Sequence, residues 1–254
     1  MLKQDNFAIA FTLIEVYNIG TTLEGEAHME KRRVIKDLSW SVPYDAAVKF
    51  LRVSEDDEEE FKVIYDEVLP LLEPVCYLGE DEIEHNDGHH LTVGGQVFTS
   101  RVVCVNLESS DKVYPFVFTS GRKAYEYAIG LDDDLYKFWA HGICEIALKS
   151  FGASVYKMVK EELGTENVFN MGPGSVIDWP ITEQKPLFAL LGDVYENTGI
   201  ELSDTFLMHP IKSGSGFYYV SEKHFASCML CPRNGCPNRK APFDSEKFKR
   251  EYGE

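Results

Sequence analysis

Residues 172–219 read GPGSVIDWPITEQKPLFALLGDVYENTGIELSDTFLMHPIKSGSGFYY, and this stretch decides the expected fold. It begins as a loop rich in Gly and Pro and continues at 181–199 with apolar residues at helical spacing. Strand-like pieces follow at 200–208 and 215–222, with no regular crossover helix between them. This order favours an α+β chain with an antiparallel sheet over a doubly wound parallel sheet.

The chain before this stretch also mixes helical and strand-like patterns. Helical spacing occurs at 44–53, 58–72 and 133–163, and strand-like segments occur at 90–100 and 112–121. The segment 100–107 fits either a helix or a strand. Because 133–163 is long for one helix, we expect Gly142 or Gly152 to bend it.

The composition is that of an acidic globular protein. The 254 residues carry a formal net charge of −17, and 44% of them are hydrophobic. A chain of this length buries roughly 70% of its unfolded surface, so it forms a core without disulfides. The negative charge repels phosphate backbones and no Lys/Arg stripe offsets it, so nucleic acid is not an expected partner.

The sequence contains no pattern for membrane insertion or export. No apolar stretch reaches the roughly 20 residues that a membrane helix requires. The N-terminal FAIAFTLIEVYNIG is interrupted by Glu15 and Asn18 and lacks a basic leader. We therefore expect a cytoplasmic protein with no membrane partner. The codons for LEGE at 23–26 are purine-rich, which raises the hypothesis of a ribosome-binding site with Met29 as the true start.

Three clustered cysteines stand near the C-terminus, in CMLCPRNGCPNRKAPF at 228–243. Cys228, Cys231 and Cys236 have the spacing C-x2-C-x4-C, in which a tight turn brings two thiolates to one ion or cluster. Nearby basic residues favour thiolates. In a reducing compartment such clusters bind metal more often than they form disulfides. The sequence therefore predicts a metal site, and three free thiols in a loop are the alternative.

Three thiolates are one ligand short of a closed site. The fourth ligand could come from outside the chain or from one of its other side chains: Cys76, Cys104, Cys144 or His224. The spacing does not distinguish zinc from an iron–sulfur cluster.

The Gly/Pro loop is the second candidate site. Gly172 and Gly174 flank Pro173, which gives a rigid backbone with few side chains that a ligand can approach closely. The helix start that follows adds N–H groups able to face a carboxylate or phosphate. An ordinary long connection is the alternative. The histidine-rich segment EHNDGHH at 84–90 fits an exposed polar loop better than a metal site.

Taken together, these elements resemble the activation domain of cobalamin-dependent methionine synthase. The resemblance rests on Pro173-Gly174, Glu183-Gln184-Lys185, TGIELSDTFLMHP at 198–210 and KSGSG at 212–216. Upstream, VGGQVFTSRVV and VFTSGRKAYEYAIGLDD resemble stand-alone relatives found beside corrinoid methyltransferases in anaerobes. Some of those relatives also carry a tail similar to the C-x-x-C-P-x-x-x-C-P-x-R found here.

The resemblance implies a C-shaped α+β fold with a central antiparallel sheet and packed helices. It divides the chain into a doubtful leader (1–28), an N-terminal helical region (29–89), an activation-domain-like core (90–226) and a cysteine-rich tail (227–254).

The resemblance also implies binding of S-adenosylmethionine, which this domain presents while inactive cob(II)alamin is reduced and remethylated. The ligand, or a related one, is expected to contact Asn170, Gly172, Pro173, Gly174, Ser175, Ser213, Ser215 and Gly216. The chain departs from the family pattern at Asn170, where the family has Arg, and at Ser175, where it has Tyr.

The expected function is that of an accessory protein for reductive activation of a corrinoid-dependent methyltransferase. The cobalamin would belong to a corrinoid partner, and an iron–sulfur cluster at the three cysteines would relay an electron. The alternative is a non-catalytic adaptor that docks a corrinoid protein and holds a structural zinc. The chain is too short for a complete methionine synthase.

Overall fold

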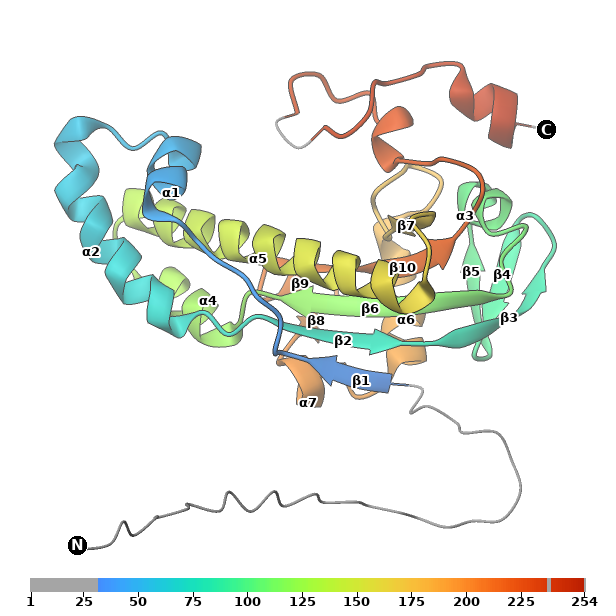
Figure 1. The fold of residues 1–254 in the computed structure, drawn as a ribbon, viewed down its shortest axis with the longest axis horizontal. Coiled ribbons are helices and arrows are strands. Elements are labelled where there is room, and N and C mark those ends of the chain that lie inside the picture. The colour runs from blue at the N-terminus through green and yellow to red at the C-terminus, as the bar shows by residue number, and fades with distance from the viewer. Residues whose placement is uncertain (1–31, 237–238, 254) are drawn as a thin grey trace, which may run out of the picture.

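The computed structural model describes residues 32–236 and 239–253. The expected leader at 1–28 and the alternative start at Met29 lie outside these ranges. The described chain combines helices with an antiparallel sheet (Figure 1). Among the described helices, none is long and apolar enough to cross a membrane.

The sheet is built around strand β6 (Lys112–Thr119). It pairs with β10 (Ser213–Val220) on one side and with β2 (Val75–Gly79) and β3 (Asp81–Asn86) on the other. The sheet is completed by β1 (Arg32–Ile35), β4 (His90–Val93), β5 (Gln96–Thr99) and β7 (Val168–Met171). A separate two-stranded sheet pairs β8 (Glu201–Leu202) with β9 (Met208–His209).

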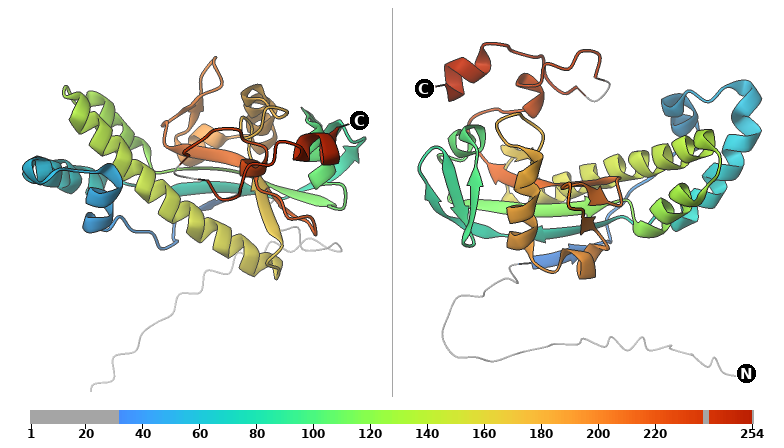
Figure 2. Two further views of the ribbon diagram at one scale, coloured as in Figure 1. Left: turned by 90° about the horizontal axis from the view of Figure 1, so that it is seen from above. Right: turned by 180° about the vertical axis from the view of Figure 1, so that it is seen from behind.

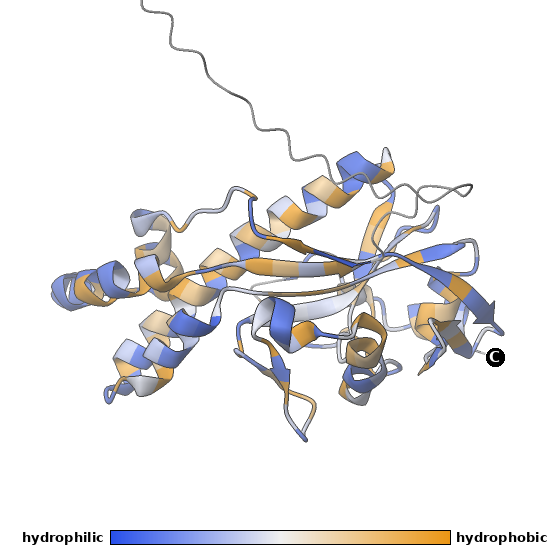
Figure 3. Cartoon of the chain, turned by 90° about the horizontal axis from the view of Figure 1, so that it is seen from below, coloured by the Kyte–Doolittle hydropathy of each residue, from blue (hydrophilic) through white to orange (hydrophobic). Residues whose placement is uncertain are grey.

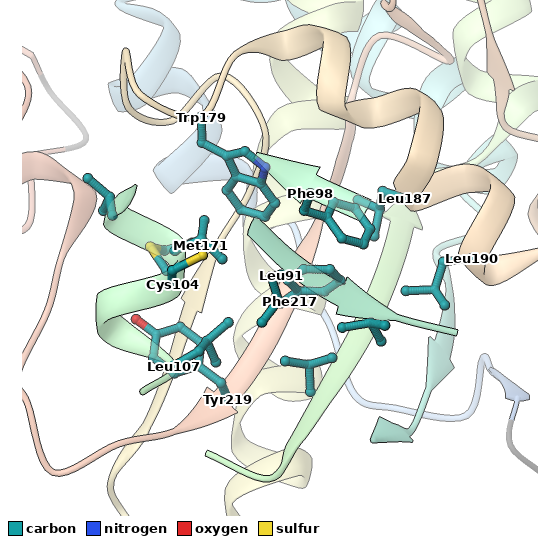
Figure 4. Close-up of a cluster of buried hydrophobic side chains, with 14 of the residues drawn as sticks. Leu91, Phe98, Cys104, Leu107, Met171, Trp179, Leu187, Leu190, Phe217 and Tyr219 are labelled. Carbon is teal, nitrogen blue, oxygen red and sulfur yellow. The ribbon is translucent and has the colours of Figure 1, made fainter. Parts of the chain in front are cut away.

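Alternate side chains of the central strands enter two different cores. Val113 and Val117 of β6 belong to a cluster with α3 (Arg101–Asn106) and α6 (Gln184–Leu191), which Figure 4 shows in part. On the opposite face, Phe116 packs with Phe151 and Val155 of α5 (Asp134–Leu163). Figure 2 shows α5 lying along one face of the sheet and α6 on the other side. The period-two alternation of a strand thus separates the helices into two layers.

A third core forms beside the sheet. Around the first half of α5 pack α1 (Tyr44–Leu51), α2 (Glu58–Val68) and α4 (Arg122–Gly130), as Figure 1 shows. In Figure 3, α2 alternates between hydrophilic and hydrophobic residues, as an amphipathic helix should. The short helix α7 (Val194–Thr198) contacts β2.

Two sequence expectations for residues 29–163 differ from the structure, and one open alternative is decided by it. Residues 29–89 contain α1 and α2 as expected, but they also supply β1, β2 and β3, so residue 90 does not separate a helical part from the sheet. The long helix is continuous from Asp134 to Leu163. Gly142 and Gly152 do not interrupt it. Both glycines allow close packing, because a Cβ at Gly142 would meet Leu51 and a Cβ at Gly152 would meet the Phe118 ring.

The segment 100–107, which fits either a helix or a strand by sequence, forms the helix α3. Ser100 is its N-cap, and its Oγ accepts a hydrogen bond from the Val103 amide at 3.1 Å. The C-terminal residues 239–253 return to the main core. Tyr252 is buried there, and Asn106 Nδ2 donates to its hydroxyl at 3.1 Å.

Removing the Phe61 side chain should destabilise the helical group strongly. Phe61 is fully buried and its ring lies 5.6 Å from that of Trp139, measured between centroids. We expect Phe61→Ala to lower the free energy of unfolding by about 3–5 kcal/mol in chemical denaturation. Val63 on the same helix is 56% exposed, so Val63→Ala should change it by less than about 0.5 kcal/mol. Equal losses of unfolding free energy in Phe61→Ala and Val63→Ala would contradict this packing.

Candidate functional site

The Gly/Pro loop and the start of β10 touch each other through their backbones. Met171 of β7 pairs with Phe217 of β10, and the chains remain close at the next residues. A Cβ at Gly172 would lie 2.3 Å from the Ser215 carbonyl oxygen, and one at Gly216 would lie 2.0 Å from that of Met171. Real Cβ atoms do not approach carbonyl oxygens so closely, so both positions require glycine.

The loop itself is closed by its own hydrogen bonds. The Gly174 amide donates to the Trp179 carbonyl at 2.7 Å, and the Ser175 amide donates to the Gly172 carbonyl at 3.0 Å. Trp179 is fully buried and its ring lies 5.6 Å from that of Phe217 (Figure 4). The tryptophan therefore fastens the loop to the main core.

Two carboxylates attach this region to the neighbouring elements. Asp178 Oδ2 accepts hydrogen bonds from Ser100 Oγ at 2.6 Å and from the Val102 amide at 2.8 Å, at the start of α3. Glu183 Oε2 accepts one from the Thr99 amide at 3.1 Å, and burial raises the pKa of this carboxyl group. Sequence reasoning missed both contacts, because they join residues about 80 positions apart.

A further polar contact joins β10 to α6. Ser215 Oγ donates to Gln184 Oε1 at 2.9 Å, and Gln184 is almost fully buried. The segment that carries Gln184 is part of the resemblance, but sequence reasoning did not assign this residue to the site. The burial of Gln184 next to the Ser215 hydroxyl indicates its place at the site, and this contact is visible only in the structure.

The predicted ligand residues do not all lie together. Gly172, Ser215 and Gly216 are in direct contact, and Pro173, Gly174 and Ser175 continue the same loop. Ser213 begins β10 opposite Thr119 and its Oγ donates to the Pro210 carbonyl at 2.7 Å. Asn170 is exposed on β7 opposite Tyr218. The assignment of these residues to a ligand stays a prediction.

In the described part of the chain, two cavities are lined by residues of α7 and its neighbours and by none of the Gly/Pro loop. One of about 520 Å³ includes Trp40, Arg122 and Asn197 in its lining, and one of about 450 Å³ includes Phe188 and Tyr195. The Arg122 guanidinium donates hydrogen bonds to the Gly199 carbonyl oxygen and to the Glu201 carboxylate.

The three tail cysteines are half-buried in a loop that an arginine organises. The Arg239 guanidinium donates to the carbonyl oxygens of Cys228 at 2.9 Å and Cys231 at 3.1 Å. It also donates to those of Ala241 and Arg233. The backbone carbonyls of the loop thus converge on a cation of the protein itself.

The metal site predicted at the three tail cysteines stays a prediction. Within residues 32–236 and 239–253, no group of three or more His, Cys, Asp or Glu side chains is arranged to hold a metal ion. The proposed fourth ligands are also elsewhere: Cys76, Cys104 and Cys144 lie in three different cores, and His224 is exposed with its ring against Phe169.

The histidine-rich segment at 84–90 is a polar hairpin: residues 84–86 end β3, residues 87–89 form the turn and His90 begins β4. Asp87 Oδ1 accepts hydrogen bonds from the amides of His89 and His90, and its Oδ2 contacts His90 Nδ1 at 3.1 Å. These contacts hold the pKa of the Asp87 carboxyl group below its ordinary value.

Replacing Gly216 should destabilise the junction of loop and strand. Gly216 has φ 155° and no room for a Cβ, so we expect Gly216→Ala to cost about 2–4 kcal/mol of unfolding free energy in denaturant titrations. Gly130 in α4 has open space around it, and Gly130→Ala should be neutral or slightly stabilising. A neutral Gly216→Ala would refute the close approach.

The six thiols should fall into two reactivity classes. Burial raises the pKa of the Cys104 thiol to about 12 and that of Cys144 to about 11, and it raises that of Cys76 as well. A raised pKa leaves little reactive thiolate at mildly alkaline pH. We expect an aromatic disulfide reagent to titrate three thiols quickly in the reduced native protein and the other three only after unfolding. Fast reaction of all six would contradict the burial.

Comparison with known proteins confirms the fold. No protein-family model and no curated protein matches the sequence. A solved structure described as the MetH reactivation domain bound to AdoHcy matches 74% of this chain and 73% of its own, at 17% identity and a TM-score of 0.50. The expected C-shaped α+β fold, with a central antiparallel sheet and packed helices like those of the methionine synthase activation domain, is therefore confirmed.

Proposed function

We propose that this chain binds S-adenosylmethionine or a related S-adenosyl ligand and serves the reductive activation of a corrinoid-dependent methyltransferase. One observation supports the proposal above others. The two segments assigned to the ligand from sequence, the loop after Asn170 and the turn before Phe217, touch through Gly172 and Gly216. The fold is that of a domain solved with AdoHcy bound.

The loop offers the ligand a fixed backbone and small polar groups. Its hydrogen bonds and the buried Trp179 hold it in one shape, which lowers the entropic cost of binding. Ser175 and Ser215 add hydroxyl groups, and both are half-buried. These residues fit a polar ligand that lies against the backbone.

The ligand carboxylate has lost the partner that the family pattern provides. Asn170 stands in place of Arg, and an amide makes a weaker hydrogen bond to a carboxylate than a guanidinium does. We therefore propose weaker binding than in a protein that carries the arginine.

A corrinoid protein, or a corrinoid methyltransferase, is the proposed partner, and the cytoplasm is the proposed location. The cobalamin would be held by the partner. The iron–sulfur cluster or zinc predicted at Cys228, Cys231 and Cys236 would require ligands that the described residues do not bring together. Iron, zinc and sulfide counts on anaerobically purified protein test this point directly.

The ligand proposal is tested by calorimetry on the full chain with S-adenosylmethionine and AdoHcy. We expect both to bind, and we expect Asn170→Arg to tighten binding roughly tenfold, because a charged hydrogen bond contributes about 1.5–3 kcal/mol. Thr205→Arg makes the same change in charge at an exposed position of the β8–β9 turn and is the matched control.

Two results would count against this proposal. Binding of neither ligand would remove the S-adenosyl site, and an adaptor that only docks a corrinoid protein would then be favoured. Equal tightening by Asn170→Arg and Thr205→Arg would mean that net charge, and not the position beside the loop, controls affinity.

A further inference from the structure

Cys228 and Cys231 lie at the two ends of one tight turn. The turn Ser227–Met229 is a 3-10 helix, and the Cys231 amide donates to the Cys228 carbonyl at 3.3 Å. In a turn with this hydrogen bond the first and fourth Cα atoms are less than about 7 Å apart. A disulfide joins Cα atoms about 4.4–6.8 Å apart. The backbone is therefore suited to a bond between these two sulfurs.

Two hydrogen bonds distinguish Cys228 from Cys231. The Lys240 amide donates to Cys228 Sγ at 3.4 Å, and the Arg239 guanidinium donates to the Cys228 carbonyl oxygen at 2.9 Å. Cys231 Sγ has no such contact among those that the structure records, so the two thiols differ.

The turn is also anchored to the rest of the protein. Ser227 Oγ donates to Ser175 Oγ at 3.2 Å, and Leu230 packs against the main core. Arg239 crosses from the far side of the loop to the Cys228 and Cys231 carbonyls. These contacts hold the turn at 228–231 against the main core and against Arg239.

We propose that Cys228 and Cys231 form a redox-active dithiol that reacts by thiol–disulfide exchange with a small-molecule or protein disulfide. The Cys228 thiolate attacks one sulfur of the disulfide, forms a mixed disulfide and releases the first thiolate. The Cys231 thiolate then attacks Cys228 Sγ, which closes the internal disulfide and releases the second. Two electrons pass to the incoming disulfide, and the two protons lost by the cysteines end on the two released thiols.

This activity does not depend on the proposed S-adenosyl site, because it uses only the turn and the Arg239 loop. Cys236 is the internal comparison. It is also half-buried and exists in the same loop, but it lies outside the hydrogen-bonded turn. The proposal therefore predicts a specific pair among the three half-buried thiols of the tail.

The test uses the full chain, reduced and purified without oxygen, and oxidised glutathione as the disulfide. After acid quenching and alkylation, peptide mapping should find an internal disulfide between Cys228 and Cys231. Cys231→Ser should accumulate glutathione on Cys228, because the resolving thiol is absent. Cys236→Ser should form the same internal disulfide at an unchanged rate.

Several outcomes would overturn the proposal. These are an internal disulfide that includes Cys236, failure of the wild-type thiols to react, or stoichiometric iron or zinc that protects them until it is chelated. Circular dichroism shows whether each variant is folded. The peptide map of the oxidised wild-type protein tests the proposed pair even if a variant does not fold.

Discussion

The close approach of β7 and β10 at Gly172 and Gly216 is the constraint on which the rest of the arrangement depends. A single methyl group at either position would meet a carbonyl oxygen. The contact brings the Gly/Pro loop beside the start of a strand that pairs with the central strand β6. Because β6 also joins two cores, the geometry of the loop is coupled to the whole sheet. A ligand at the loop would then contact backbone that the fold already holds in place.

Arg239 holds the backbone of the tail in place, as the close approach at Gly172 and Gly216 holds the Gly/Pro loop. Four carbonyl oxygens of the cysteine loop accept hydrogen bonds from its guanidinium. A half-buried loop needs such partners for its backbone groups. Arg239 therefore joins the part of the loop that carries Cys228 and Cys231 to the residues that follow it.

The antiparallel α+β arrangement was predictable from sequence, because the strand-like patterns at 90–100, 112–121 and 215–222 are clear. The expected strand at 200–208 is wrong: it forms the two short strands β8 and β9 with a turn between them, outside the main sheet. Strand β2 was not predictable, since all five of its residues are buried and no polar alternation marks it. The helix at 101–106 depends on Asp178, far along the chain, for part of its capping. The cysteine spacing predicts a metal site, but it does not show where Arg239 lies. Local patterns therefore identified the elements, whereas the contacts that define the sites are non-local.

Charge distribution gives the tail a different environment from the rest of the protein. Residues 227–254 contain six Lys/Arg and four Asp/Glu, whereas the whole chain has a net charge of −17. The overall field repels anions at long range, and salt screens it beyond about 10 Å. Close to Cys228, the Arg239 guanidinium is a cation that can attract the carboxylates of a small anionic disulfide. Encounter with such a disulfide should be slowed at low salt by the net negative charge of the protein, and the Arg239 guanidinium opposes this effect near the reacting sulfur.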